Sequence, residues 1–215
     1  MPVKVFPSLL AADFSELEKE LKKLEKAGAD GIHLDIMDGK YVPNISFGFP
    51  VIKSFYKKTF LPLDMHLMIE NPEKFVDRFL EFNPSYLSFH LEAAENPEKL
   101  IQKIKAKHCK AGLAVNAGIE VETVFPFLHL IDFVLIMTVE AGFGGQKFIE
   151  ENTEKIKKLA ALRKEKNLLF EIEADGGINP ENSKKLTSFG AGIIVSGSAV
   201  FNSGSFSDTI KKLRL

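Results

Sequence analysis

The stretch GIHLDIMDG, residues 31–39, alternates apolar side chains with a second set that contains His33 and Asp35. Alternation with a period of two is typical of a β-strand, whose successive side chains point to opposite faces of the sheet. On an edge strand, the face with the histidine and the carboxylate would point to solvent. In a closed sheet it would point into a cavity, where the two side chains could form a site.

Similar apolar runs recur along the whole chain. The eight predicted strands span residues 3–10, 31–37, 61–68, 86–91, 111–116, 131–139, 168–175 and 191–197. Amphipathic segments lie between them, and the clearest predicted helices span residues 15–28, 71–82, 96–107 and 148–166. Strands that alternate with helices along a chain indicate a parallel sheet.

Local signals predict several helix ends. Ser15 and Glu18 have the spacing of a capping box at the start of the first helix, and Gly28 is placed to end it in a left-handed conformation. Asn71 and Asn96 each precede Pro-Glu, which predicts an asparagine N-cap followed by proline in the first helical turn.

Eight strand–helix repeats within 215 residues favour a compact (β/α)8 TIM barrel, formed as a single domain by residues 1–215. The alternative is an open doubly wound sheet, but no G-x-G-x-x-G motif follows the first strand. Active sites of barrels lie at the C-terminal ends of the strands. Polar side chains that are late in a strand and point inward are therefore the candidates for a site.

The overall composition excludes several classes of function. The chain has 28 Lys and Arg against 29 Asp and Glu, so no basic surplus indicates nucleic-acid binding. The single Cys109 excludes an internal disulfide, and we expect a reducing, cytoplasmic location. We identify no signal peptide and no run of about 18 apolar residues that would span a membrane. The outward faces of the predicted helices carry no plain apolar stripe that would mark an interface, which leaves open whether the chain forms a homo-oligomer.

Four inward-facing residues late in the predicted strands form a candidate metal site: His33, Asp35, His66 and Asp175. Side chains at i and i+2 of a strand project the same way, so His33 and Asp35 can reach one ion. Imidazole and carboxylate ligands suit one divalent cation per chain, such as Zn2+, Fe2+, Mn2+ or Co2+. The alternative is that each histidine is a hydrogen-bonded core residue, but the pairing on neighbouring strands favours the metal site.

Three glycine-containing loops follow the last three predicted strands. They are AGFGGQKF (141–148), DGGI (175–178) and SGS (196–198). Glycines let backbone N–H groups approach an anion closely, and barrels often bind phosphate between the loops after strands 7 and 8. The alternative is three tight turns without a ligand.

The positions of two carboxylates indicate the type of reaction. Asp35 and Asp175 end strands 2 and 7, on opposite sides of the predicted barrel mouth, so one could take a proton from a substrate and the other could deliver one to the opposite face. A divalent cation beside a carbonyl would stabilise an enediolate. Met37, Met68 and Met137 also point inward and could exclude water, although methionines more often simply fill a core. Proton transfer by two carboxylates through a cation-stabilised enediolate is the chemistry of an epimerase acting next to a ketone.

Several motifs resemble the ribulose-phosphate 3-epimerase family, in order and at every strand end, from Phe6 to about Phe201. They are PSLLAADF (7–14), HLDIMDGKYVPNISFG (33–48), DMHLM (64–68), HLEA (90–93), VLIMTVEAGFGGQKF (134–148), EADGGI (173–178) and VSGSAVF (195–201). The resemblance implies a ribulose-phosphate-binding barrel that interconverts D-ribulose 5-phosphate and D-xylulose 5-phosphate in the pentose phosphate pathway.

The resemblance also implies roles for individual residues. It makes Asp35 the proton acceptor and Asp175 the donor, with the metal held by both aspartates and by His33 and His66. The residues implied in substrate and phosphate binding are Ser8, His66, Gly142, Phe143, Gly144, Gly145, Asp175, Gly176, Gly177, Gly197 and Ser198. Residues 39–47 would form a loop that closes over the site, and Asp38, on the outward parity, would shape the turn into it.

The chain departs from the family pattern at Glu140-Ala141 and at Asn116-Ala117, where the family usually has Asn-Pro. Neither departure touches the expected metal or acid–base residues. The closest rival is a 3-epimerase for a related ketose phosphate such as allulose 6-phosphate. A barrel decarboxylase is disfavoured because His66 occupies the place of its catalytic lysine, and a non-catalytic phosphosugar-binding barrel would not need both aspartates.

Overall fold

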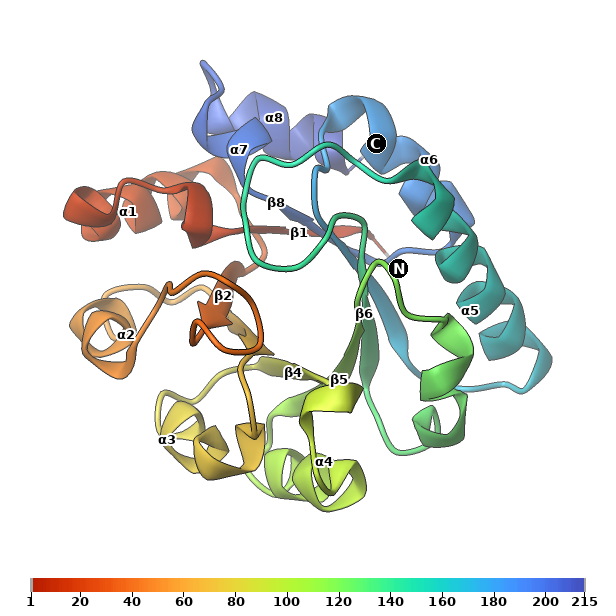
Figure 1. Ribbon diagram of the computed structural model, residues 1–215. Coiled ribbons are helices and arrows are strands. Elements are labelled where there is room, and N and C mark those ends of the chain that lie inside the picture. The colour runs from red at the N-terminus through yellow and green to blue at the C-terminus, as the bar shows by residue number, and fades with distance from the viewer. Residues whose placement is uncertain (1, 215) are drawn as a thin grey trace.

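The computed structural model describes residues 2–214, and its eight parallel strands curve into a barrel (Figure 1). The strands are β1 (Lys4–Pro7), β2 (Ile32–Met37), β3 (Leu63–Met68), β4 (Tyr86–His90), β5 (Lys110–Val115), β6 (Phe133–Met137), β7 (Glu171–Asp175) and β8 (Ile193–Ser196). They pair in the order β1-β8-β7-β6-β5-β4-β3-β2. The predicted (β/α)8 TIM barrel is confirmed.

The helices form the outer ring of the barrel (Figure 1). The α-helices are α1 (Leu17–Ala27), α2 (Phe49–Phe55), α3 (Val76–Leu80), α4 (Pro97–Lys105), α5 (Thr153–Glu165), α6 (Pro180–Phe189), α7 (Ser198–Phe201) and α8 (Phe206–Leu213). Short 3-10 turns are η1 (Leu9–Ala11), η2 (Phe14–Glu16), η3 (Pro72–Lys74), η4 (Leu91–Ala93), η5 (Val121–Phe127) and η6 (Glu150–Asn152). The region 71–82 is thus a turn plus a short helix, because Pro72 and the left-handed Asn71 delay the α-helix.

The seam between β1 and β2 completes the ring. Ser8 and His33 form a parallel bridge there, and the Asp30 carboxylate accepts a hydrogen bond of 2.8 Å from the backbone N–H of Val5. The predicted site residue Ser8 is thereby held beside the strand that carries His33 and Asp35.

Strand β2 is buried at all six of its positions, which excludes a solvent-facing edge strand. Its aliphatic residues, Ile32, Leu34 and Ile36, belong to the large apolar cluster that also contains residues of the surrounding helices. The other face, with His33 and Asp35, points into the barrel. The inward face of residues 32–37 is therefore part of the inner wall of the barrel.

Two of the predicted helix caps are confirmed. Gly28 ends α1 with a φ of 79°, and its N–H bonds to carbonyl oxygens of the last turn. The Asn96 side chain accepts a hydrogen bond of 3.1 Å from the N–H of Lys99 at the start of α4. Asn71, in contrast, makes no side-chain cap, so this prediction is wrong.

The predicted capping box at Ser15 and Glu18 is also wrong. Asp13 takes the capping position, because its carboxylate accepts hydrogen bonds from the N–H and the hydroxyl of Ser15 at 2.9 and 2.6 Å. A 3-10 turn follows, and α1 begins only at Leu17. Asp13 therefore caps the 3-10 turn that precedes the helix, and Ser15 lies inside that turn instead of capping α1.

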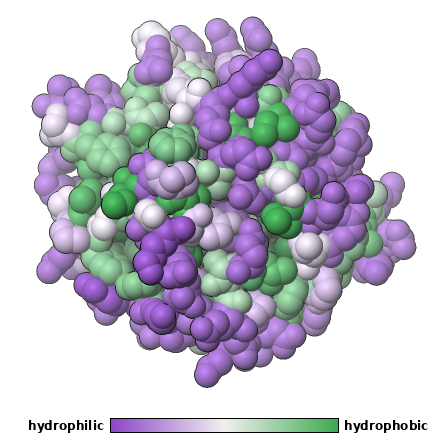
Figure 2. Space-filling view, viewed as in Figure 1, coloured by the Kyte–Doolittle hydropathy of each residue, from purple (hydrophilic) through white to green (hydrophobic). Residues whose placement is uncertain are grey.

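The surface around the barrel end in view is mainly hydrophilic at its outer edge, and apolar residues gather nearer the middle (Figure 2). Within residues 2–214, no helix has the length and apolar character needed to cross a membrane.

Candidate active site

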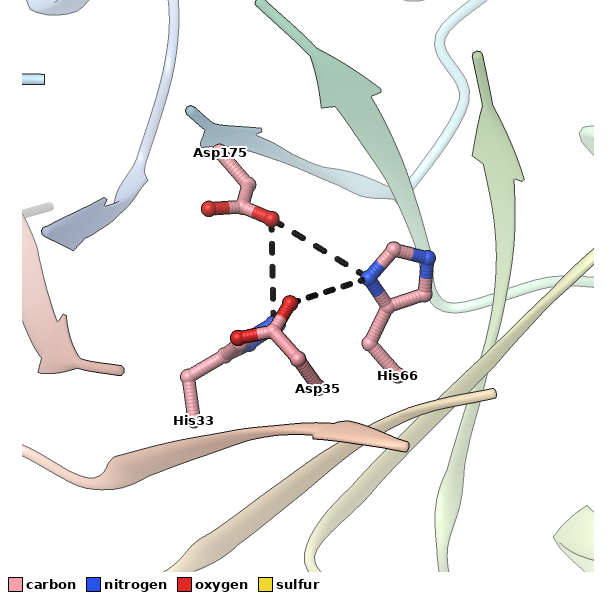
Figure 3. A group of neighbouring side chains, drawn as sticks. All are labelled: His33, Asp35, His66 and Asp175. Atoms are coloured by element: carbon pink, nitrogen blue, oxygen red, sulfur yellow. Dashed lines mark ion pairs between the residues drawn. The ribbon is translucent and has the colours of Figure 1, made fainter. Parts of the chain in front are cut away.

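The four candidate metal ligands converge at the C-terminal end of the barrel (Figure 3). His33 and Asp35 lie on β2, His66 on β3 and Asp175 on β7. His33 Nε2 lies 3.5 Å from Asp35 Oδ1 and 3.8 Å from Asp175 Oδ2. His66 Nδ1 lies 3.8 and 4.0 Å from the same two oxygens. Residues far apart in the sequence thus present four ligand atoms to one point.

The donor set fits a divalent cation. His33 Nε2 and His66 Nδ1 are fully buried and have no hydrogen-bond partner among the described residues. Four ligand atoms bound tetrahedrally at about 2.1 Å would be about 3.4 Å apart, close to the separations seen here. A buried polar atom without a partner is costly, so the two free nitrogens indicate that this cluster could hold a metal.

In both histidines, the ring nitrogen that points away from the candidate metal site contacts a buried side chain. His33 Nδ1 lies 2.5 Å from Asp64 Oδ2, and His66 Nε2 lies 2.9 Å from His90 Nε2. Hydrogen bonds of this kind fix the ring orientation and the tautomer of a metal-binding histidine. Sequence reasoning gave Asp64 and His90 no role, although both lie on inward-facing strand positions beside the ligands.

The two aspartates have opposite electrostatic environments. Burial opposes the charge on Asp35, but His33 and His66 hold its pKa well below the usual value. Its second oxygen, Oδ2, also accepts a hydrogen bond of 2.5 Å from the Ser8 hydroxyl. Burial and the neighbouring Asp35 carboxylate raise the pKa of Asp175 to about 7. Carboxylates whose pKa values are pushed apart are typical of an acid–base pair.

A cavity opens above these residues. Its lining contains both aspartates and the other predicted substrate and phosphate residues, while His33 and His66 are buried beneath it. The predicted residues in the lining are Ser8, Asp35, Met37, Met68, Met137, Gly142, Phe143, Gly144, Gly145, Asp175, Gly176, Gly177, Gly197 and Ser198. Glu140 is the acidic residue at the exposed rim of this cavity.

Comparison with known proteins identifies the family. The model of the ribulose-phosphate 3-epimerase family matches residues 4–201. The chain belongs to the ribulose-phosphate 3-epimerase family. The cytoplasmic isoform of this enzyme from Oryza sativa subsp. japonica is 43% identical, over 98% of this chain and 92% of the relative. Ribulose-phosphate 3-epimerase of Bacillus subtilis is 42% identical, over 99% and 98%. The resemblance in the sequence motifs is confirmed, and the chain is an isomerase-class enzyme.

Solved structures of lower identity share only the fold. A tryptophan synthase chain from Mycobacterium tuberculosis superposes with a TM-score of 0.68 at 11% identity, covering all of this chain and 93% of the other. Phosphoribosylanthranilate isomerase of Thermotoga maritima gives 0.64 at 18% identity, covering 98% and 96%. Both likenesses agree with the barrel and carry no information on the reaction.

In this epimerase, glycine is required where the loops after β6 and β7 touch. Gly177 has a φ of 65°, and a Cβ there would lie 2.8 Å from the backbone nitrogen of Phe148. Gly176 has a φ of 117°, and a Cβ there would lie 2.9 Å from the backbone nitrogen of Val139. The two loops therefore pack backbone to backbone, and both glycines line the cavity.

The loop after β2 packs against residues that line the cavity, and we call residues 38–46 the lid. Asp38 accepts hydrogen bonds from the N–H groups of Lys40 and Tyr41 at 2.8 and 3.0 Å, so it shapes the turn as the sequence predicted. Val42 of the lid packs with Met37 and Met68. Asn44 Nδ2 donates a 2.7 Å hydrogen bond to the carbonyl oxygen of Gly142, which connects the lid to the loop after β6.

The two departures from the family pattern contact each other. The Asn116 side chain accepts a hydrogen bond of 3.3 Å from the N–H of Ala141. Gln146 Nε2 donates to the carbonyl oxygens of Glu140 and Phe143, at 2.6 and 2.8 Å. These bonds give the glycine loop the internal support that a proline would otherwise supply.

Proposed function

We propose that the protein interconverts D-ribulose 5-phosphate and D-xylulose 5-phosphate, with Asp35 and Asp175 moving the C3 proton. The observation that carries this proposal is the pair of carboxylates at the ends of β2 and β7, which face one cavity with opposite electrostatic environments. The family's curated members carry the name of this reaction.

In the proposed reaction the ionised Asp35 takes the proton from C3, and the C3–H electron pair forms the enediolate of the sugar. The protonated Asp175 then gives its proton to the opposite face of C3, which inverts this centre. The reverse direction uses the same groups with their roles exchanged. The Ser8 hydroxyl keeps one oxygen of Asp35 oriented while the other faces the cation site.

We assign one divalent cation to His33, Asp35, His66 and Asp175, on the support of the two unpartnered nitrogens and the ligand separations. When bound, such a cation stabilises negative charge that develops on the substrate oxygens. Zn2+, Fe2+, Mn2+ and Co2+ all accept this mixture of imidazole and carboxylate. The methionines and Val42 above the site exclude water from the reacting carbon.

We place the phosphate at the loops after β6, β7 and β8. The proposed contacts are the backbone N–H groups of five residues that line the cavity, Gly144, Gly145, Gly177, Gly197 and Ser198. Backbone groups at such loops bind an anion without a lysine or arginine. With the phosphate bound at these loops, C3 of the sugar would lie in the cavity beside the two aspartates. We propose a cytoplasmic location, as printed for the relative from Oryza sativa.

The test is turnover in D2O, followed by NMR of C3. The wild-type protein should form xylulose 5-phosphate that carries deuterium at C3, because Asp175 exchanges its proton with solvent. Asp35→Asn and Asp175→Asn should each lower turnover by about 10²- to 10⁴-fold, since each removes one proton-transfer group.

The matched control is Asp77→Asn on the outer helix α3, where the exposed carboxylate pairs with Lys103. An active Asp35→Asn, Asp175→Asn double variant would refute the mechanism. Measuring kcat/KM for ribulose 5-phosphate and for allulose 6-phosphate in parallel tests the substrate, and a preference for the hexose phosphate would refute the pentose assignment.

A further inference from the structure

A line of side chains runs from the candidate ligand His66 to the lid. His66 Nε2 meets His90 Nε2 at 2.9 Å, and His90 Nδ1 faces Glu92 Oε1 at 3.6 Å. Tyr41 in the lid donates a hydrogen bond of 2.7 Å from its hydroxyl to the same Glu92 oxygen. Its ring also lies over the ring of His90, with centroids 4.7 Å apart.

Only one of the two Nε2 atoms that meet between His66 and His90 can carry a proton. A neutral imidazole carries one N–H, so one Nε2 must donate and the other must accept. If His66 accepted, its own proton would sit on Nδ1 and point at Asp35 and Asp175, where it would block a cation. If His66 donates, its Nδ1 keeps a free lone pair directed at the two carboxylates, as the metal site requires.

Glu92 settles which of the two arrangements is favoured. Burial opposes its charge, but the His90 imidazole 3.6 Å away, its own backbone and the hydrogen bond from Tyr41 hold the pKa of Glu92 at about 2. A carboxylate is an acceptor only, so the nitrogen that faces it, His90 Nδ1, gains from carrying the proton. His90 Nε2 is then the acceptor, and His66 must donate to it.

We propose that His90 and Glu92 are positioning residues that hold His66 in the tautomer with a free Nδ1, and that Tyr41 fixes Glu92 from the lid. None of the three touches the substrate or the cation in this role. The inference rests on the proposed function, because it needs a cation at His66 Nδ1. It extends that proposal to His90 on β4, Glu92 in η4 and Tyr41 in the lid, and thereby connects the position of the lid with the orientation of the ligand His66.

The first test measures cation affinity. The dissociation constant for Co2+ is determined by competition with a chelating dye, and the visible absorption of the Co2+ protein reports its ligand field. His90→Leu should bind Co2+ about 10- to 100-fold more weakly, because His66 loses the acceptor that fixes its tautomer. His90→Gln offers a carbonyl oxygen as acceptor and should recover most of the affinity and the wild-type spectrum.

Glu92→Gln should weaken Co2+ binding in the same direction, because an amide can donate as well as accept and no longer dictates the His90 proton. Glu92→Gln also tests the proposal if His90→Leu fails to fold. The matched control is Ser88→Ala, a fully buried polar residue on the same strand and the same inward face as His90. This variant should bind Co2+ as the wild type does.

The second test uses the protein without metal. Long-range 1H–15N NMR correlations of the histidine rings identify the tautomer of His66, which should carry its proton on Nε2 in the wild type. A wild-type Nδ1–H tautomer would overturn the inference, and so would unchanged Co2+ affinity and spectrum in folded His90→Leu and in Glu92→Gln. If the wild type bound no Co2+, the proposed metal site would fall together with this inference; the other two results remove the positioning role alone.

Discussion

Gly112 on β5 illustrates how closely single residues are fitted inside the barrel. A Cβ at this position would overlap the ring of Phe133 on the neighbouring strand β6. That ring is fully buried and packs edge-on against Tyr86, with centroids 5.5 Å apart and an angle of 75°. The absence of a side chain at Gly112 is therefore what allows a phenylalanine to fill the layer below the site.

Gly112→Ala should destabilise the fold by about 1–3 kcal/mol, because the added methyl group forces the Phe133 ring out of its position. Urea unfolding measures this change. Gly118→Ala is the control, since a Cβ there meets no atom within 4 Å. The double variant Gly112→Ala, Phe133→Leu should recover part of the lost stability, because the ring that the added methyl group overlaps is gone. Equal midpoints for Gly112→Ala and the wild type would contradict the overlap.

The clustering of the four candidate ligands could be predicted from the sequence, but the side chains that hold the two histidines could not. The i, i+2 spacing of His33 and Asp35 fixes a shared face, and that follows from strand geometry alone. The contacts of Asp64 and His90 depend on strand register, which places His33 beside Asp64 in the pairing of β2 with β3. Register between distant parallel strands is set by the whole packed sheet and has no local signature.

At the level of elements, the strands were predicted more reliably than the helix ends. All eight strands occur, but most begin one to a few residues later than the apolar runs, as β7 does at Glu171. Apolar residues such as Phe170 lie just before a strand and still belong to the core, so hydrophobicity overestimates the paired length. The predicted start of the first helix was wrong because a 3-10 turn capped by Asp13, with Ser15 inside it, precedes α1.

The lid is held by polar contacts on two sides. Tyr41 bonds to Glu92 after β4, and Asn44 bonds to Gly142 after β6. A Cβ at Gly142 would lie 3.3 Å from Val42 Cβ, so the lid and the glycine loop also pack closely. Because Gly142 belongs to the loop that we assign to phosphate, the position of the lid depends on the same loop as substrate binding.

Asn44→Ala should raise KM for the sugar phosphate more than it lowers kcat. The lost hydrogen bond is worth about 0.5–1.5 kcal/mol, which corresponds to an increase of about 2- to 12-fold. Steady-state kinetics measure both constants. Lys40→Ala, in the same loop, removes only an exposed ion pair with Glu70 and should leave both constants close to the wild type. A change confined to kcat in Asn44→Ala would contradict the role in substrate retention.

For the whole molecule, the barrel end opposite the site is closed by a cluster of charged residues. Glu171 on β7 accepts from Lys4 on β1 and from Lys110 on β5, each at 2.6 Å. The Tyr86 hydroxyl on β4 accepts from the same two lysines, at 2.9 and 3.2 Å. Four strands that lie around the ring are thus joined at one point, so we expect this cluster to contribute to the stability of the closed barrel.

The pH dependence of this cluster follows from its pKa directions. Burial opposes the charge on Glu171, but hydrogen bonds from Lys110 and Lys4 lower its pKa below the usual 4.5. A lowered carboxyl pKa stabilises the fold above pH 4.5 and loses that contribution as the pH falls through the folded-state value. Burial likewise opposes the charge on both lysines, yet their bonds to Glu171 and Tyr86 raise their pKa above 10.5, so their contribution persists until the pH exceeds that value.

Glu171→Gln should therefore be less stable than the wild type at pH 7, and the difference should shrink as the pH is lowered from 5 towards 3. Urea unfolding midpoints across this range measure the effect. Comparing the two proteins at each pH cancels the contribution of the other buried carboxyl groups, which both share. Glu154→Gln removes an exposed pair with Lys157 and should run parallel to the wild type. If the midpoints of Glu171→Gln also run parallel to those of the wild type across this pH range, the ionised Glu171 does not stabilise the barrel.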